Sequence, residues 1–168
     1  LKLKLQSLGY IFQSSTDTEV ISHLLSMEIN SKKTVKDSLL SVFKTIQGKW
    51  AIAAVFESEP EKVFFAQDGA PLLIGKGKNE YFLASDLSAL VRNSTEVCYI
   101  KPKQWGYFSK NELVLFDFDG NEVVPEMKKQ EAKWEDVDKN GFPHYMLKEI
   151  YEQASIFRKV IERRIKEN

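Results

Sequence analysis

Asp17 is the residue whose type and position could most directly do chemistry. It stands in the run Ser14-Ser15-Thr16-Asp17-Thr18-Glu19, just before an apolar pattern at helical spacing, so we expect it in the first turn of a helix. Unpaired backbone N–H groups and the positive end of the helix dipole favour an ionised carboxylate there, and such a group could bind an ammonium. Asp is also common in a first helical turn for capping alone. Residue type and position therefore leave both roles open.

Other residues that could take part in catalysis stand in weaker patterns. Cys98 is the only cysteine, and it lies in the apolar strand pattern 96–100 without a basic neighbour, which predicts a buried structural thiol. His23 and His144 fall on separate predicted helices, and no residue can be named that would orient either ring for catalysis. Gly75-Lys76-Gly77 precedes a strand pattern, so we interpret it as a hairpin turn and not as a phosphate loop. The sequence predicts no metal site, no cofactor and no internal disulfide.

The composition is that of a folded protein with no net charge. Of the 168 residues, 43% are apolar and 29% are charged, which suits one globular domain with a core, plus a tail. Lys plus Arg and Asp plus Glu balance at 24 each, so we expect neither nucleic acid nor an anionic membrane as a partner. No apolar run approaches the roughly 20 residues that span a bilayer. The cytoplasm is the predicted location.

The first 48 residues carry helical patterns. Leu1, Leu5 and Leu8 fall at helical spacing before Gly9, which predicts the last turns of a helix that begins upstream of Leu1. The expected elements that follow are a short strand at 10–13, a capping box of Thr16 with Glu19, a helix ending near Asn30, and a helix that opens at Thr34 and stops before Gly48. The two longer helices should stack side by side.

Strand patterns dominate the middle of the chain, and a helical pattern ends it. Strands are expected at 50–56, 63–67, 72–74, 81–84, 97–100, 105–108, 113–118 and 122–124, with a helical turn at 87–91. The first four strands are predicted to form a meander, with turns between them that include Glu59-Pro60. Asp119-Gly120 predicts a hairpin between the last two strands. Residues 127–140 are charged and poorly patterned, which indicates an exposed boundary loop. After Pro143 one helix should run through Ile165. These elements predict a layered α+β domain over residues 1–142, with a terminal helix and linker over 143–168.

Five blocks in order resemble the glutaminase domain of the glutamine:fructose-6-phosphate aminotransferases, also called glucosamine-6-phosphate synthases. They are Ser15 to Leu24 with its Thr-Asp-Thr-Glu, Gly48 to Ala53, Ala66 to Gly75, Phe82 to Asp86, and His144 to Gln153. The first and last blocks carry most weight, since the last looks like the family's junction between its glutaminase and synthase domains. Ala154 departs from the family, which usually has Pro there, so the helix could continue where the family's linker turns.

The resemblance implies an incomplete four-layer αββα sandwich of the N-terminal nucleophile hydrolase type. It also implies the class II amidotransferase reaction, in which an N-terminal Cys attacks the glutamine amide and the ammonia passes to a sugar-isomerase domain that makes glucosamine 6-phosphate from fructose 6-phosphate. This chain opens on Leu1 and matches the domain from its middle, so no catalytic residue is expected in it and the fragment should be inactive. Only Asp17 matches a glutamine-binding position, by holding the α-ammonium group.

One further expectation follows from the resemblance, and two alternatives to it stay open. Sheet edges left open by missing strands should favour a homo-oligomer. Another class II amidotransferase, of the purine-pathway phosphoribosyl type, would explain the Asp17 segment, but it explains residues 144–153 less well. A non-catalytic binding or assembly module that reuses the fold is the third possibility, from a different class of protein.

Overall fold

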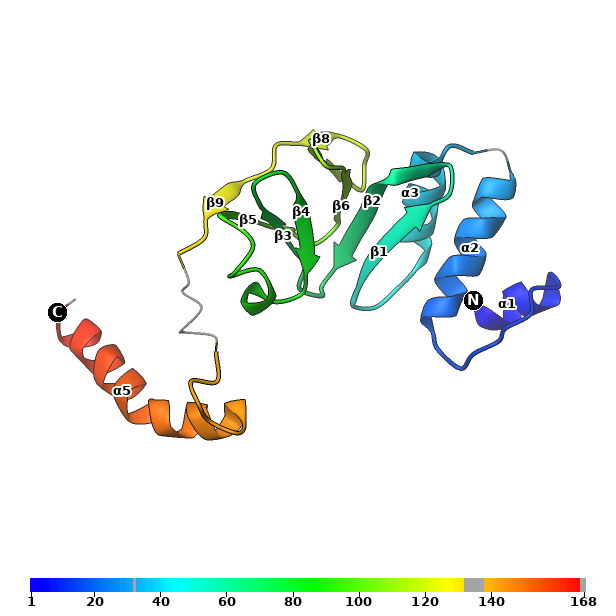
Figure 1. Cartoon of the computed structure of the whole chain (residues 1–168). Helices are drawn as coiled ribbons and strands as arrows, with labels where there is room; N and C mark the ends of the chain where they lie inside the picture. The colour runs from blue at the N-terminus through cyan, green and yellow to red at the C-terminus, as the bar shows by residue number, and fades with distance from the viewer. Residues whose placement is uncertain (32, 132–137, 167–168) are drawn as a thin grey trace. The chain divides into compact units, whose positions relative to one another are not determined.

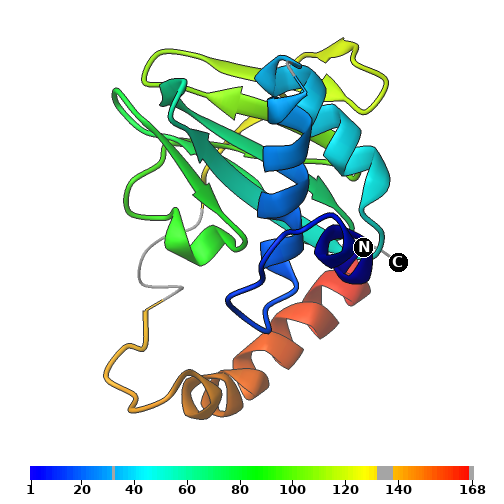
Figure 2. The same ribbon diagram turned by 90° about the vertical axis from the view of Figure 1, so that its right-hand side faces the viewer.

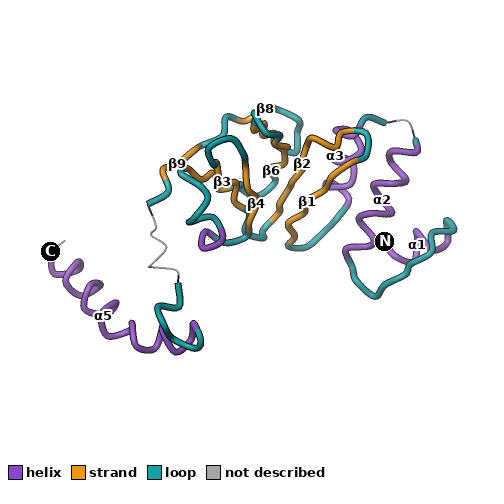
Figure 3. Tube along the Cα trace, in the orientation of Figure 1, coloured by secondary structure: helices purple, strands orange, loops and turns teal. Residues whose placement is uncertain are grey.

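The computed structural model describes residues 1–31, 33–131 and 138–166 of the chain. They divide into two compact units, Leu1–Lys129 and Gln130–Asn168 (Figure 1). The first unit carries three helices and all of the strands that the structure describes, and the second carries one long helix (Figure 3).

Three helices form one layer of the first unit: α1 (Lys2–Ser7), α2 (Thr18–Asn30) and α3 (Val35–Thr45). Gly9, with a φ of 90°, lets the chain leave α1 by a left-handed turn in which the N–H of Tyr10 donates to the carbonyl of Leu5. The hydroxyl of Thr34 caps α3 by accepting from the N–H of Asp37. As predicted, α2 and α3 pack side by side (Figure 2).

The helical layer covers one face of a five-stranded antiparallel sheet. Its order is β1 (Trp50–Phe56), β2 (Glu59–Asp68), β6 (Gln104–Phe108), β7 (Leu113–Asp117) and β8 (Glu122–Val123). Side chains of α2 and α3, such as Leu24 and Leu39, form one core with Phe64 and Trp105 of the sheet. Trp105 also donates its indole N–H to the carbonyl of Asp117, at 3.0 Å, so this buried polar atom has a partner.

A second, four-stranded sheet faces the first. Its order is β4 (Tyr81–Ala84), β3 (Leu73–Lys76), β5 (Glu96–Tyr99) and β9 (Met127–Lys129). Ile74 and Cys98 of this sheet share a buried core with Phe65, Phe108 and Leu115 of the other sheet. The opposite face of the four-stranded sheet packs against Leu90, which follows the short 3₁₀ turn η1 (Leu87–Ala89). Among the described residues of this unit, the layers are therefore α, β and β, and the last face carries the turn η1 and its flanking residues.

Four details of the sequence-based expectation are wrong. Residues 10–13 form no strand, because their backbone groups bond to α1 and to a side chain of α2 instead of to a sheet. The first four strands are not one meander, since the chain leaves the five-stranded sheet after β2 and starts the four-stranded one with β3. Glu59-Pro60 lies inside β2, and the turn falls at residues 57–58. Met127–Lys129, expected in a loop, is the edge strand β9, while residues 132–137 of that expected loop lie outside the described residues.

The capping box predicted between Thr16 and Glu19 does not form. The N-cap position is Asp17 and not Thr16, and α2 has no side-chain cap of its own. Glu19 does reach back to backbone N–H groups, but to those of Gln13 and Ser14, farther upstream than a capping box requires.

The second unit contains the predicted terminal helix as α5 (Tyr145–Lys166), in which Ala154 is an interior residue. The helix starts after His144, whose carbonyl accepts from the N–H of Lys148. Lys148 is only 3% exposed, and it donates to the carbonyl of Asp138 at 2.6 Å while lying 3.6 Å from the Glu152 carboxylate. Across the described part of the chain, no helix is long and apolar enough to cross a membrane.

Candidate functional site

Asp17 lies at the start of α2, and its carboxylate does not cap the helix. Its φ of −64° and ψ of −27° are already helical, whereas a capping residue usually has extended backbone that aims its side chain at the first N–H groups. The side chain makes no capping hydrogen bond to α2, and within the described ranges the exposed carboxylate accepts from the Thr18 hydroxyl at 3.5 Å. Capping therefore does not explain the residue in this structure.

Glu19 fixes the segment that leads into Asp17. Its two carboxylate oxygens accept from the N–H of Gln13 at 2.7 Å, the N–H of Ser14 at 2.8 Å and the hydroxyl of Ser14 at 2.7 Å. These donors favour the charged form, and the bonds from Gln13 and from the Ser14 hydroxyl lower the pKa of Glu19 from 4.5 to about 2. Asp17 and Glu19, two positions apart, thus have different environments: the Glu19 carboxylate is hydrogen-bonded to the protein, whereas the Asp17 carboxylate is exposed.

A cleft of about 510 Å³ adjoins Asp17, and we call it the Asp17 cleft. One wall is the first turn of α2, another is the loop between α3 and β1, and the third is β1 itself, the edge strand of the five-stranded sheet. The walls beside Asp17 are mostly apolar, with Gln47 and Lys49 as the polar side chains of the loop. A carboxylate at the mouth of an apolar cleft can bind a small cationic group.

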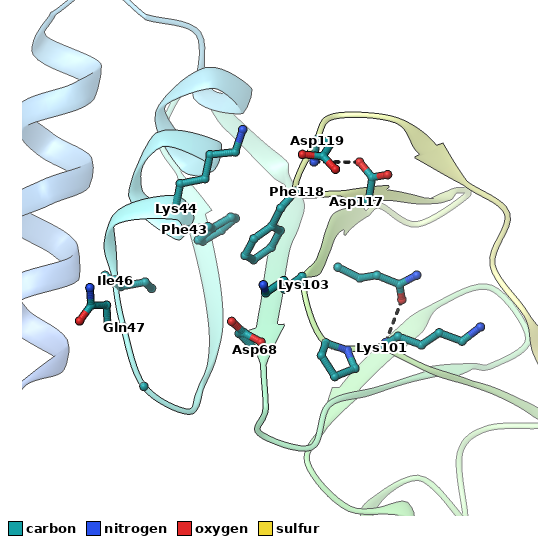
Figure 4. Close-up of a pocket in the computed structure, with 13 residues that line it drawn as sticks. Phe43, Lys44, Ile46, Gln47, Asp68, Lys101, Lys103, Asp117, Phe118 and Asp119 are labelled. Carbon is teal, nitrogen blue, oxygen red and sulfur yellow. Dashed lines mark hydrogen bonds between the residues drawn. The ribbon is translucent and has the colours of Figure 1, made fainter.

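A larger hollow of about 780 Å³ adjoins the Asp17 cleft and shares Ile46 and Gln47 with it (Figure 4). Phe43 and Phe118 stack at 5.9 Å in its wall, and both stack on Trp50 of the Asp17 cleft, at 5.5 and 6.1 Å. Some of its charged groups already have partners. The carboxylate of Asp117 accepts hydrogen bonds from the turn 119–121, and Lys101 pairs with Glu126 at 2.6 Å. Among the described residues, no Ser, Cys or His lines this hollow, so they offer it no hydroxyl or thiol nucleophile and no imidazole base.

The other candidate residues of the first unit do not line the Asp17 cleft. Cys98 is 1% exposed in the core between the sheets, where burial raises the pKa of its thiol, as expected of a structural cysteine. His23 packs on the rings of Tyr10 and Phe12, at 5.2 and 4.6 Å, and lies 3.5 Å from Glu19. His144 belongs to the other unit. Gly75-Lys76-Gly77 ends β3 and enters the hairpin to β4, as predicted. No group of three potential metal ligands gathers within the described ranges.

Sequence reasoning missed the rest of the Asp17 cleft. Gln47, Lys49 and Trp50 lie some 30 residues after Asp17 and form no motif with it. They reach the cleft because the pairing of β1 with β2, and the packing of α2 and α3 on the sheet, carry the α3–β1 loop to the start of α2. The periodic pattern predicted those elements, but it could not predict which loop faces which helix end.

Comparison with known proteins decides the family. Residues 1–92, more than half of the chain, match the family described as glutamine amidotransferase domain. The chain belongs to this family. The resemblance seen in the Asp17 segment is thereby confirmed.

The relatives extend the match along the chain. Glutamine–fructose-6-phosphate aminotransferases (isomerizing) of Bacteroides thetaiotaomicron and Thermococcus kodakarensis are 36% and 35% identical over 98% and 96% of this chain. In both cases the chain spans only 27% of the relative's length. The matched region therefore represents about a quarter of those enzymes.

A solved structure supports the fold. The glutamine phosphoribosylpyrophosphate (PRPP) amidotransferase from B. subtilis, complexed with ADP and GMP, superposes with a TM-score of 0.61 at 25% identity, over 72% of this chain and 26% of that one. Two facing antiparallel sheets with a helical layer fit this likeness. The predicted α+β sandwich of the N-terminal nucleophile hydrolase type is confirmed.

Proposed function

We propose that this chain is the glutamine-binding part of a glutaminase domain and that Asp17 binds the α-ammonium group of glutamine. The observation that carries the proposal is the exposed Asp17 carboxylate at the Asp17 cleft, with no capping bond to α2. A charge-assisted hydrogen bond contributes roughly 1.5–3 kcal/mol, so removing the charge should weaken glutamine binding about 10- to 150-fold. The apolar walls exclude water from one side of this pair, which favours its formation.

We infer that the parent protein uses the ammonia released from glutamine to make glucosamine 6-phosphate from fructose 6-phosphate. The support is that the two glutamine–fructose-6-phosphate aminotransferases named above are 35–36% identical to this chain over at least 96% of its length. A purine-pathway amidotransferase is the second candidate, favoured by the structural likeness to the B. subtilis enzyme at 25% identity over 72% of the chain. The first candidate accounts for more of this chain at higher identity. A non-catalytic module that reuses the fold is a third, and absence of glutamine turnover in the parent protein would favour it.

The 168 residues by themselves, on this proposal, bind glutamine without hydrolysing it. Their one cysteine, Cys98, is buried between the sheets, and its raised pKa keeps the thiol protonated. A thiol without its thiolate is a poor nucleophile, so Cys98 cannot replace the N-terminal cysteine of the family. Release of glutamate and ammonia from glutamine by this polypeptide would contradict the proposal.

Partners and location are inferred from the same features. The domain would deliver ammonia to a sugar-isomerase domain of its parent chain, in the cytoplasm, where the single thiol stays reduced. β1 is an edge strand of seven residues, all apolar, with one row of backbone groups unpaired by the sheet. Such an edge favours pairing with another strand, and we propose that the protein forms a homo-oligomer.

The acceptor is tested with the full-length protein that carries these residues. We expect glutamine plus fructose 6-phosphate to yield glutamate and glucosamine 6-phosphate, while phosphoribosyl pyrophosphate yields no aminated product. Amination of phosphoribosyl pyrophosphate, with none of fructose 6-phosphate, would select the second candidate instead.

A further inference from the structure

We propose that Glu19 is a positioning residue for glutamine recognition, because it holds the chain segment that aims Asp17 into the Asp17 cleft. We call its three hydrogen bonds, from the N–H of Gln13 and from the N–H and hydroxyl of Ser14, the Glu19 tether. The inference rests on the proposed role of Asp17 and adds a residue that never touches the ligand.

The start of α2 has no side-chain cap, and the Glu19 tether holds the chain segment that enters the helix. A helix start leaves backbone N–H groups that need partners, and an Asp at the N-cap normally accepts from one of them. Here the chain instead enters α2 through a tight turn, in which the carbonyls of Thr16 and Asp17 accept from the N–H groups of Glu19 and Val20, at 3.4 and 3.1 Å. Because the tether fixes the entering segment from outside the helix, the Asp17 side chain is left for a ligand.

The link from Glu19 to Asp17 is short and continuous. The Ser14 hydroxyl donates to Glu19 at 2.7 Å and accepts from the N–H of Thr16 at 3.2 Å. Thr16 immediately precedes Asp17, so the path of the chain into Asp17 depends on where Ser14 is held. Loss of the tether would let residues 13–16 rotate, and the Asp17 carboxylate would then occupy more than one direction.

Neighbouring contacts hold the segment from its other side. The Lys2 ammonium lies 4.8 Å from the ring of Phe12 and 3.4 Å from the carbonyl of Ser14. The ring of Phe12 meets His23 edge-on at 4.6 Å, one helical turn after Glu19. These contacts hold the segment against α1 and α2, whereas the Glu19 tether fixes the backbone next to Asp17.

The test compares four forms of the full-length protein in glutamine hydrolysis: wild type, Glu19→Gln, Asp17→Asn and the double variant. A glutamine side chain has one acceptor oxygen, and its NH₂ would face donors, so Glu19→Gln removes one or two of the three bonds of the Glu19 tether without shortening the side chain. We expect Glu19→Gln to raise the KM for glutamine about fivefold or more, as one lost hydrogen bond would, with little change in kcat. In the Asp17→Asn background the same change should raise KM less than about twofold, because both residues act on one contact.

Controls separate positioning from general damage. Glu28→Gln removes a carboxylate near the other end of α2, where Glu28 pairs with Lys33, and it should leave KM unchanged. If Glu19→Gln does not fold, as judged by circular dichroism, Ser14→Ala removes only the linking hydroxyl and should raise KM in the same direction. An unchanged KM in Ser14→Ala would then overturn the inference.

Two other outcomes are distinguishable. If Asp17→Asn raises KM and Glu19→Gln does not, or if the two effects multiply independently, the positioning role of Glu19 is wrong and the role of Asp17 stands. If Asp17→Asn leaves KM unchanged, the proposed function itself is wrong, and this inference is overturned with it.

Discussion

Gly106 leaves no space for a side chain, so its replacement by Ala should cost the first unit much of its stability. The residue lies in β6, paired with Phe65 of β2 and Leu115 of β7, in the middle of the five-stranded sheet. A Cβ built there would lie 2.1 Å from the carbonyl oxygen of Val114, and contacts below 3.0 Å are essentially never seen. The clashing atom belongs to the backbone, so no side-chain rotation relieves the contact.

The magnitude follows from what must move. β6 and β7 would have to separate by roughly 1 Å at this pair, which weakens one or two ladder hydrogen bonds of about 1 kcal/mol each and strains the core between the sheets by about 1–3 kcal/mol. We expect Gly106→Ala to lower the free energy of unfolding by about 2–5 kcal/mol, a large share of the roughly 5–15 kcal/mol typical of a domain.

Urea unfolding followed by the fluorescence of the buried Trp105 measures the change. Gly120→Ala is the matched control, because a Cβ there meets nothing within 4 Å, but the φ of +92° is unfavourable for Ala. The control should cost about 1–2 kcal/mol. If Gly106→Ala costs no more than Gly120→Ala, the close approach of β6 and β7 is wrong.

Two other predictions concern titratable groups. Cys98 should react with a thiol reagent orders of magnitude more slowly in the native protein than in urea, because it is 1% exposed and its pKa is raised; equal rates would place it outside the core. Glu19 has a pKa lowered to about 2, so its contribution to stability is present above pH about 4.5 and is lost as the pH falls toward 2. Acid unfolding of Glu19→Gln should therefore show a smaller loss over that interval than wild type, and identical curves would refute the assigned environment.

Local patterns predicted the elements whose signals lie within the element itself. The capping hydroxyl of Thr34 and the apolar spacing after it gave α3, and the unbroken apolar run of Trp50–Phe56 gave β1 with its observed bounds. Two elements depended on distant partners and were missed or misread. Residues 10–13 look like a strand but have no sheet beside them, whereas the charged Met127–Lys129 is a strand because β5 offers it an open edge.

The site was predictable only in part, for the same reason. Asp17 could be singled out from its place before a helical pattern, and the spacing of Glu19 indicated that this carboxylate reaches back along the chain. The true partners of Glu19 became visible only in the structure, because the path of residues 10–16 depends on packing against α1 and His23. The walls formed by Gln47 and β1 depend on tertiary packing and carried no local signal.

The most direct test of the role of Asp17 compares the binding of glutamine and N-acetylglutamine to the full-length protein and to its Asp17→Asn variant by calorimetry. N-acetylglutamine lacks the α-ammonium charge, so the wild type should prefer glutamine, and Asp17→Asn should weaken glutamine binding by about 10- to 150-fold and remove most of that preference. An Asp17→Asn variant that binds glutamine as tightly as the wild type, with the same preference over N-acetylglutamine, would contradict the ammonium-binding role of Asp17.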